Sequence, residues 1–292
     1  MDEAIQPINV QSAKQKIKSY SHNPGSLILA GLVGLAALLT VLTLVFIVGY
    51  ILIKGIPNLT PELFQLEYNS ENVSMFPAII NTICMTVLSL LIAGPLGILA
   101  AVYLVEYAKK GNKLVSLVRV TAETLTGIPS IVYGLFGMLF FVTTLHWGYS
   151  MLAGAFTLAI MVLPVIMRTT EEALLSVPDT FREASFGLGA GRLRTIFVVI
   201  LPSAVPGIFS GVILSIGRIV GETAALMYTA GTVAELPKSV MSSTRTLSVH
   251  MYSLASEGLY VGQAYATAVV LLLIVLIINW ISGRIARKIK KG

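Results

Sequence analysis

Three charged residues lie in or beside long apolar stretches, where an ionised side chain is costly. Arg218 and Glu222 are four residues apart in one stretch, a spacing that predicts a shared helix face. Arg168 ends another stretch, shortly after Leu163-Pro164, where the helix backbone could open. Because the planar guanidinium fork suits phosphate and other oxyanions, these residues predict charged groups along an anion pathway.

Each of these features also has a simpler interpretation. Arg218 and Glu222 could neutralise each other as a structural lock, and Arg168 could be a basic anchor at the cytoplasmic end of a span. Residues 127–130 (Gly-Ile-Pro-Ser) could expose backbone N–H groups to an anion, but such kinks are common in membrane helices. The sequence leaves these alternatives open.

The composition predicts the surroundings of these residues. Of 292 residues, 55% are hydrophobic and 12% are charged, and the mean hydropathy is +0.85. An ordinary soluble domain has about 25% charged residues, so a polytopic membrane protein is expected. The single cysteine, Cys84, excludes an internal disulfide and a cysteine-cluster metal site.

The uncharged runs predict the membrane spans, because a helix needs about 20 apolar residues to cross a bilayer. The run at 27–53 is too long for the apolar core of a signal peptide, so it is expected to be an uncleaved first span. The polar and aromatic residues at 146–149 predict a hairpin turn. We therefore expect an all-α membrane protein with six spans, at about 27–53, 76–105, 122–145, 150–167, 203–231 and 260–283.

The basic residues predict the orientation of these spans. Sixteen of the 20 fall on one side, and Lys54, Lys238 and Arg245 fall on the other. By the positive-inside rule both termini are cytoplasmic, and the basic charge needs no nucleic acid to explain it. The chain is then a tail at 1–26, a membrane domain at 27–284 and a basic tail at 285–292. The sixteen are Lys14, Lys16, Lys18, Lys109, Lys110, Lys113, Arg119, Arg168, Arg182, Arg192, Arg194, Arg284, Arg287, Lys288, Lys290 and Lys291.

Small residues share the predicted helix face of Arg218. A continuous helix would place Gly207, Gly211, Gly221, Ala225 and Thr229 on one arc with Arg218 and Glu222. Such a face lets another helix approach closely, so Arg218 is expected to look into a helix interface or a pathway, away from lipid.

The segment 168–202 is predicted to be the largest cytoplasmic segment. Pro178 and Asp179 predict a helix start, and Gly189 and Gly191 predict its end. Phe181, Ala184, Ser185 and Leu188 form a small apolar stripe between them, and a second helix is expected from about Arg192 to Pro202. The first helix suits docking into a groove of a soluble partner, and it could equally lie among lipid headgroups.

This segment resembles the EAA loop of ABC importer permeases. Glu183-Ala184-Ser185, three residues, Gly189, nine residues, Val199, one residue and Leu201-Pro202 match its spacing, with Ser185 and Val199 as conservative departures. The resemblance implies the MetI-like fold of type I importers and a loop that docks on an ATP-hydrolysing subunit. The implied coupling residues are Pro178, Phe181, Glu183, Ala184, Ser185, Gly189, Leu201 and Pro202.

Three further segments resemble the permeases of the phosphate ABC importer, the PstA type in particular. They are GIPSIVYGLFG (127–137), PVIMRTTEEAL (164–174) and GRIVGETAALMYTAG (217–231). The resemblance covers about residues 75–285 and implies Arg168, Arg218 and Glu222 as pathway residues. It also implies a PstC-type permease as dimer partner, two PstB-type ATPase subunits that bind ATP and magnesium, and an external PstS-type phosphate-binding protein. The implied location is the cytoplasmic membrane of a bacterium or archaeon.

Catalysis on this chain is not expected. It has no G-x-x-x-x-G-K-[ST] motif for ATP, and His22, His146 and His250 lack acidic or cysteine neighbours at metal-ligand spacing. No cofactor or metal is therefore predicted on the chain itself. Two other functions stay open: an ABC permease for another oxyanion or small polar solute, and a secondary transporter or channel that works alone.

Overall fold

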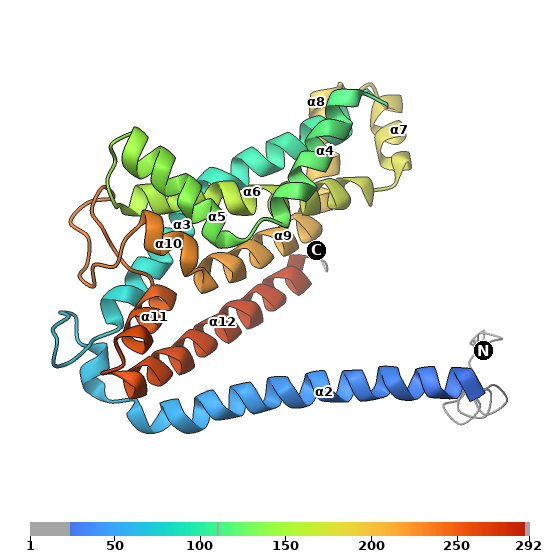
Figure 1. Ribbon diagram of the computed structural model, residues 1–292. Helices are drawn as coiled ribbons and strands as arrows, with labels where there is room; N and C mark the ends of the chain where they lie inside the picture. The colour runs from blue at the N-terminus through green and yellow to red at the C-terminus, as the bar shows by residue number, and fades with distance from the viewer. Residues whose placement is uncertain (1–23, 110, 290–292) are drawn as a thin grey trace. The chain divides into compact units, whose positions relative to one another are not determined.

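The computed structural model describes residues 24–109 and 111–289, and every regular element in these ranges is helical (Figure 1). This confirms the all-α prediction. Five of the described helices are long and apolar enough to cross a membrane, or six if one bent pair forms a single span. His22 and most of the predicted N-terminal tail lie outside the described residues.

The chain divides into two units, Met1–Ile53 and Lys54–Gly292. Helix α2 (Pro24–Gly55) provides nearly all the described residues of the first unit. Its 32 residues give a length of about 48 Å, enough to cross a bilayer. The hydroxyls of Thr40 and Thr43 donate to the carbonyls of Ala36 and Leu39, so these polar groups are satisfied within the helix.

Helix α6 (Met151–Leu175) forms the centre of the second unit. Helices α3 (Phe76–Val102) and α9 (Leu201–Gly221) both pack against it. Its side chains Leu158, Met161 and Ile166 are fully buried and share one core with Met85 of α3 and Ile219 of α9. Helix α12 (Val261–Ile289) packs against α9 and against α11 (Leu247–Glu257) (Figure 1).

Shorter helices connect these long ones. Three of them are π-helical turns that continue or precede a longer helix: η3 (Tyr103–Tyr107), η4 (Met138–Thr144) and η5 (Thr195–Ile200). The others are η1 (Ile56–Asn58), η2 (Pro61–Phe64), α4 (Lys113–Thr126), α5 (Ser130–Gly137), α7 (Asp179–Gly187), α8 (Arg192–Arg194) and α10 (Ala224–Thr229).

The span predicted at 122–145 is not one straight helix. Helices α4 and α5 meet at an angle of 103°, and they pass for a membrane span only as a pair. Ile128 precedes Pro129, and a residue before proline disfavours the helical conformation. The Tyr133 hydroxyl donates to the Leu125 carbonyl at 2.7 Å, so the break is bridged by a hydrogen bond across the bend.

The helix predicted to run to residue 231 ends at Gly221. Glu222 has an extended backbone, and α10 begins two residues later. The Glu222 carboxylate accepts from the Ala225 N–H at 3.1 Å, and the Ser248 hydroxyl donates to the Glu222 carbonyl at 2.6 Å. These bonds satisfy polar groups that the interrupted helix leaves open, which makes the break affordable inside a packed bundle.

Helix α6 is longer than the predicted fourth span, whereas α9 ends before the predicted end of the fifth. It passes Pro164 without a break and continues to Leu175, eight residues beyond the predicted end at 167. Arg168 is therefore an interior residue of a long helix. The predicted turn at 146–149 lies between η4 and α6, where His146 and Gly148 have φ of 56° and 64°. Helix α11 lies in a segment where no helix was predicted.

Candidate functional site

Helices α6 and α9 approach each other at two glycines of α9. A Cβ added to Gly207 would collide with Ala173, and one added to Gly211 would collide with the Thr169 side chain. The prediction that this glycine face permits a close helix contact is confirmed at these two glycines, whereas a Cβ added to Gly221 would meet nothing within 4 Å. The two helices run in opposite directions, and Gly211 lies beside Thr169. Arg218 is therefore about 10 Å from the level of Arg168, measured along the helix axes toward the start of α6.

Arg218 does not share a helix face with Glu222, because α9 ends between them. In the described part of the chain no carboxylate lies within ion-pair distance of Arg218, so the predicted structural lock is not formed. Arg218 is partly exposed and interacts electrostatically with Tyr133 of α5. The arginine therefore faces the region of the α4–α5 break, whereas the buried Glu222 caps α10.

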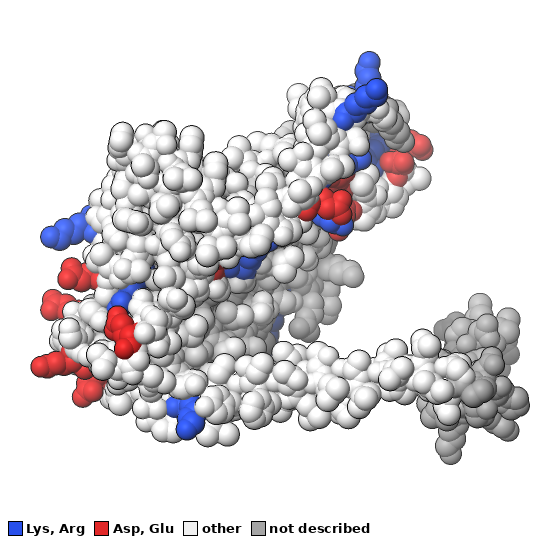
Figure 2. Space-filling model, viewed as in Figure 1, with Lys and Arg blue, Asp and Glu red and all other residues white. Residues whose placement is uncertain are grey.

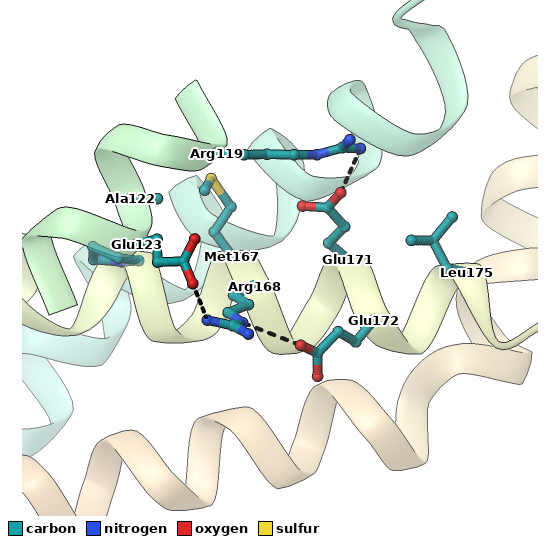
Figure 3. Close-up of a pocket in the computed structure, with 9 residues that line it drawn as sticks. Arg119, Ala122, Glu123, Met167, Arg168, Glu171, Glu172 and Leu175 are labelled. Atoms are coloured by element: carbon teal, nitrogen blue, oxygen red, sulfur yellow. Dashed lines mark hydrogen bonds and ion pairs between the residues drawn. The ribbon is translucent and has the colours of Figure 1, made fainter. Parts of the chain in front are cut away.

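Arg168 lies between two carboxylates. Its Nε is 3.1 Å from Glu172 Oε1 one turn further along α6, and its Nη1 is 3.5 Å from Glu123 Oε1 on α4 (Figure 3). All three side chains are more than half exposed, at 57% for Arg168, 64% for Glu172 and 71% for Glu123. Glu123 lies near the end of α4, directly before the bend. The sequence signalled Glu172 through its i,i+4 spacing, but no local pattern pointed to Glu123.

A second ion pair joins the same two helices. Arg119 Nη2 of α4 lies 2.5 Å from Glu171 Oε1 of α6, and Glu171 is only 12% exposed (Figure 3). The two pairs line a pocket of about 280 Å³ between α4 and α6. Its lining residues are Arg119, Ala122, Glu123, Pro164, Met167, Arg168, Glu171, Glu172 and Leu175.

The charged side chains around this pocket indicate whether lipid, water or another protein chain lies against it. Figure 2 shows acidic and basic side chains at the end of the second unit where α4, α7 and α8 lie and again at its opposite end, with a broad uncharged surface between the two groups. Exposed ionised side chains on membrane helices are costly against hydrocarbon, and they normally face water or another protein chain. The face of α4 and α6 that carries Arg168 is therefore suited to a water-filled pathway or to a partner chain.

The predicted coupling residues lie on and around helix α7, which begins at Asp179 directly after Pro178, as expected. The predicted stripe divides into two sides. Ser185 is buried, and its hydroxyl lies 2.8 Å from the Thr195 hydroxyl, whereas Phe181, Ala184 and Leu188 are exposed. Glu183 is also exposed. An exposed face with one inward-facing small residue fits a helix that is held from behind and presents its outer side to a partner.

The end of α7 and the start of the next helix follow the glycine pattern. Gly189 has a φ of 78°, a conformation that favours glycine, and it lies two residues beyond the end of α7. The following helix begins at Arg192, as predicted, but it continues through Leu201 and Pro202 to Gly221. Leu201 is partly buried and Pro202 is exposed.

Arg182 fastens α7 to the membrane helices, a role that the sequence did not reveal. Its Nη2 and Nε lie 2.7 and 3.2 Å from Glu106 Oε1 in η3, at the end of α3. The same guanidinium donates to the carbonyls of Leu174 and Val177 at the end of α6. Both charged side chains are largely buried, at 15% exposure for Arg182 and 9% for Glu106.

Arg192 adds a second contact at the same place. It donates to the Glu106 carbonyl, and its guanidinium lies 4.8 Å from the centre of the Tyr107 ring. Arg182 and Arg192, on either side of the turn at Gly189, therefore join the segment 168–202, here called the coupling segment, to the end of α3.

A buried arginine that has no carboxylate partner among the described residues lies at the other end of the bundle. Arg245 is 5% exposed, and its guanidinium lies 4.7 Å from the Tyr68 ring centre, a cation–π contact. His250 packs edge-on against the same ring. Burial, and next the nearby Arg245 charge, lower the pKa of His250 to about 3. His250 is therefore neutral at physiological pH.

The described residues contain no group of three histidine, cysteine or acidic side chains able to hold a metal ion. His146 lies in the turn before α6 and His250 lies in α11.

Comparison with known proteins identifies the family of this architecture. Residues 93–291 match the family described as "Binding-protein-dependent transport system inner membrane component". This range includes α6, the coupling segment and Arg218. The chain is 34% identical to a probable ABC transporter permease protein, YqgI, of Bacillus subtilis, over 89% of this chain and 95% of that protein. It is 37% identical to the phosphate transport system permease protein PstA of Pasteurella multocida, over 81% and 85% of the two chains.

Solved structures show the same fold at low sequence identity. A bacterial alginate ABC transporter chain, crystallised with an alginate-bound periplasmic protein, superposes with a TM-score of 0.69 at 17% identity and covers 94% of this chain. A chain of the MetNI methionine ABC transporter in an inward-facing conformation gives a TM-score of 0.57 at 21% identity, over 74% of this chain and 94% of that one.

Proposed function

This chain belongs to the family of binding-protein-dependent transport system inner membrane components, and we propose that it is the permease through which an ABC importer moves inorganic phosphate. It is a multi-pass permease subunit of the inner membrane. The observation that carries the choice of substrate is the 37% identity to a PstA permease over most of both chains. The side chains that support it are the arginines, since guanidinium groups suit phosphate.

Arg168 and Arg218 serve successive positions of the ion along one route. They are about 10 Å apart along the packed helices α6 and α9, too far to chelate one phosphate from a shared level. Arg218 has no carboxylate partner among the described residues, so its charge is available to an anion. Glu222 contributes by capping α10 and so shapes the route without binding the ion.

The proposed partners follow from the same family. A PstC-type permease would cover the charged face of α4 and α6, and a PstS-type protein would deliver phosphate from outside. A pair of PstB-type ATPase subunits would bind ATP and magnesium and dock on the exposed face of α7. Pro178 starts this helix, Phe181, Glu183 and Ala184 face the partner, and Ser185 anchors the inner side. Gly189, Leu201 and Pro202 set the turn and the helix that carries the motion to Arg218.

Reconstitution in liposomes tests this proposal. Vesicles that contain this chain, the other permease, the ATPase enclosed with ATP, and the external binding protein should accumulate labelled phosphate. Sulfate, molybdate or phosphonate in excess should compete poorly. Strong competition by one of these anions would assign the permease to that anion. Transport by this chain without any ATPase would instead identify a secondary transporter or channel.

A further inference from the structure

Arg168 has two carboxylate partners that differ in how they are attached. Glu172 lies on the same helix, so no rigid movement of α6 can separate it from Arg168. Glu123 lies on α4, and α4 is joined to α5 through the 103° bend that follows it. A movement of the last turn of α4 at that bend would take Glu123 away from Arg168, while the Arg119–Glu171 pair one turn earlier and α6 stay in place. The Arg168–Glu123 contact is also the longer of the two, at 3.5 Å against 3.1 Å.

The pocket has an excess of negative charge. Arg119 and Glu171 neutralise each other at 2.5 Å, which leaves one guanidinium, Arg168, facing the carboxylates of Glu123 and Glu172. Phosphate carries between one and two negative charges near neutral pH, so each carboxylate beside Arg168 repels it and also competes with it for the guanidinium. Phosphate is therefore held less tightly at Arg168 while both carboxylates remain beside it.

We infer that Glu123 is an exchangeable counter-ion of Arg168 that competes with phosphate for the guanidinium. The inference rests on the proposed function and adds a release step to it. When the last turn of α4 moves away, the side of Arg168 that faced Glu123 can bind phosphate. When this turn returns, the Glu123 carboxylate takes the guanidinium again and the ion leaves. Glu172 stays beside Arg168 throughout and orients it.

The test measures how long the assembled transporter keeps phosphate. In the purified complex, Glu123→Gln keeps the size of the side chain and removes its charge, so labelled phosphate should dissociate about two- to fivefold more slowly. This range corresponds to the loss of one exposed ion pair. The half-saturating phosphate concentration for uptake should fall together with the maximal uptake rate. Glu123→Asp, which keeps the charge, should restore much of the wild-type dissociation rate.

Glu171→Gln provides the matched control in the same pocket. It removes the carboxylate that pairs with Arg119 and leaves both partners of Arg168 in place. Its phosphate dissociation rate should change less than that of Glu123→Gln. Equal changes in the two variants, or a wild-type rate in Glu123→Gln, would overturn the inference. If the wild-type complex neither binds nor transports phosphate, the proposed function fails and this inference fails with it.

Discussion

Two arginine–carboxylate pairs in this permease join the same kinds of side chain with different strength. Arg182 and Glu106 are 15% and 9% exposed and meet at 2.7 Å, and the Arg182 guanidinium also donates to two backbone carbonyls. Arg168 and Glu123 are 57% and 71% exposed and meet at 3.5 Å. A buried, fully bonded pair is costly to break, whereas an exposed pair contributes little to stability. The first pair is therefore a fixed joint between α7 and α3, and the second is loose enough to open.

This difference matches what the proposed function requires of each region. A segment that couples an ATPase to the membrane helices would have to transmit a movement without deforming, so its contacts would be permanent. A side chain that binds an ion in transit would have to release it, so its contacts would be exchangeable.

Breaking the fixed joint should have the largest effect. Arg182→Met leaves the Glu106 carboxylate buried without its partner, and truncating one member of such a pair typically costs about 3–5 kcal/mol. Thermal unfolding of the purified permease should shift accordingly, and the ATPase should no longer co-purify. Asp179→Asn is the matched control, because Asp179 also pairs with Arg182 but is 83% exposed. If the ATPase co-purified with Arg182→Met as it does with the wild type, α7 would not need this joint to bind the ATPase.

Arg218→Gln should abolish transport without weakening the protein. Arg218 forms no ion pair in the described part of the chain, so its loss breaks no joint, yet the proposed route loses the arginine that lies further from the segment 168–202. Phosphate uptake should fall to background while thermal unfolding and ATPase association stay near those of the wild type. Lys238→Gln removes an exposed external charge instead and should transport normally. Wild-type uptake kinetics in Arg218→Gln would remove Arg218 from the pathway.

The surroundings of Arg245 and His250 predict a smaller effect, a dependence of the free energy of unfolding on pH. His250 has a pKa of about 3 in the fold and about 6.5 in the unfolded chain, so only the unfolded chain takes up a proton as the pH falls through this window. Unfolding should therefore become easier by about 1 kcal/mol between pH 8 and pH 6. His250→Gln should flatten this dependence, and His146→Gln, at an exposed turn, should leave it unchanged. A parallel slope in wild type and His250→Gln would contradict the assignment.

The local features of the coupling segment could be read from the sequence. Pro178-Asp179 marked the start of α7, and Gly189 marked the turn after it, because proline and glycine restrict or release the backbone regardless of the surroundings. Arg168 was recognisable as a charged residue at a membrane helix. Its partner Glu172 was not predicted, although the i,i+4 spacing of the two residues would have indicated it.

The contacts between distant segments could not be read in this way. Glu106 and Arg182 are 76 residues apart, and no periodic pattern links them. The break at Glu222 was missed because the residues around it contain no proline, and the hydrogen bond that supports it comes from Ser248 in another helix. The expectation that Arg218 and Glu222 share a face failed for this reason, since it assumed an unbroken helix.

Double-mutant cycles on the two pairs measure whether Arg182 and Glu106 form a fixed joint and Arg168 and Glu123 an exchangeable contact. Thermal unfolding of the purified permease is measured for Glu106→Gln, Arg182→Met and their combination, and in parallel for Glu123→Gln, Arg168→Met and their combination. The coupling energy should be about 2–3 kcal/mol between Arg182 and Glu106, and below about 1 kcal/mol between Arg168 and Glu123. Equal coupling energies, or a stronger coupling between Glu123 and Arg168, would contradict the division into a fixed joint and an exchangeable contact.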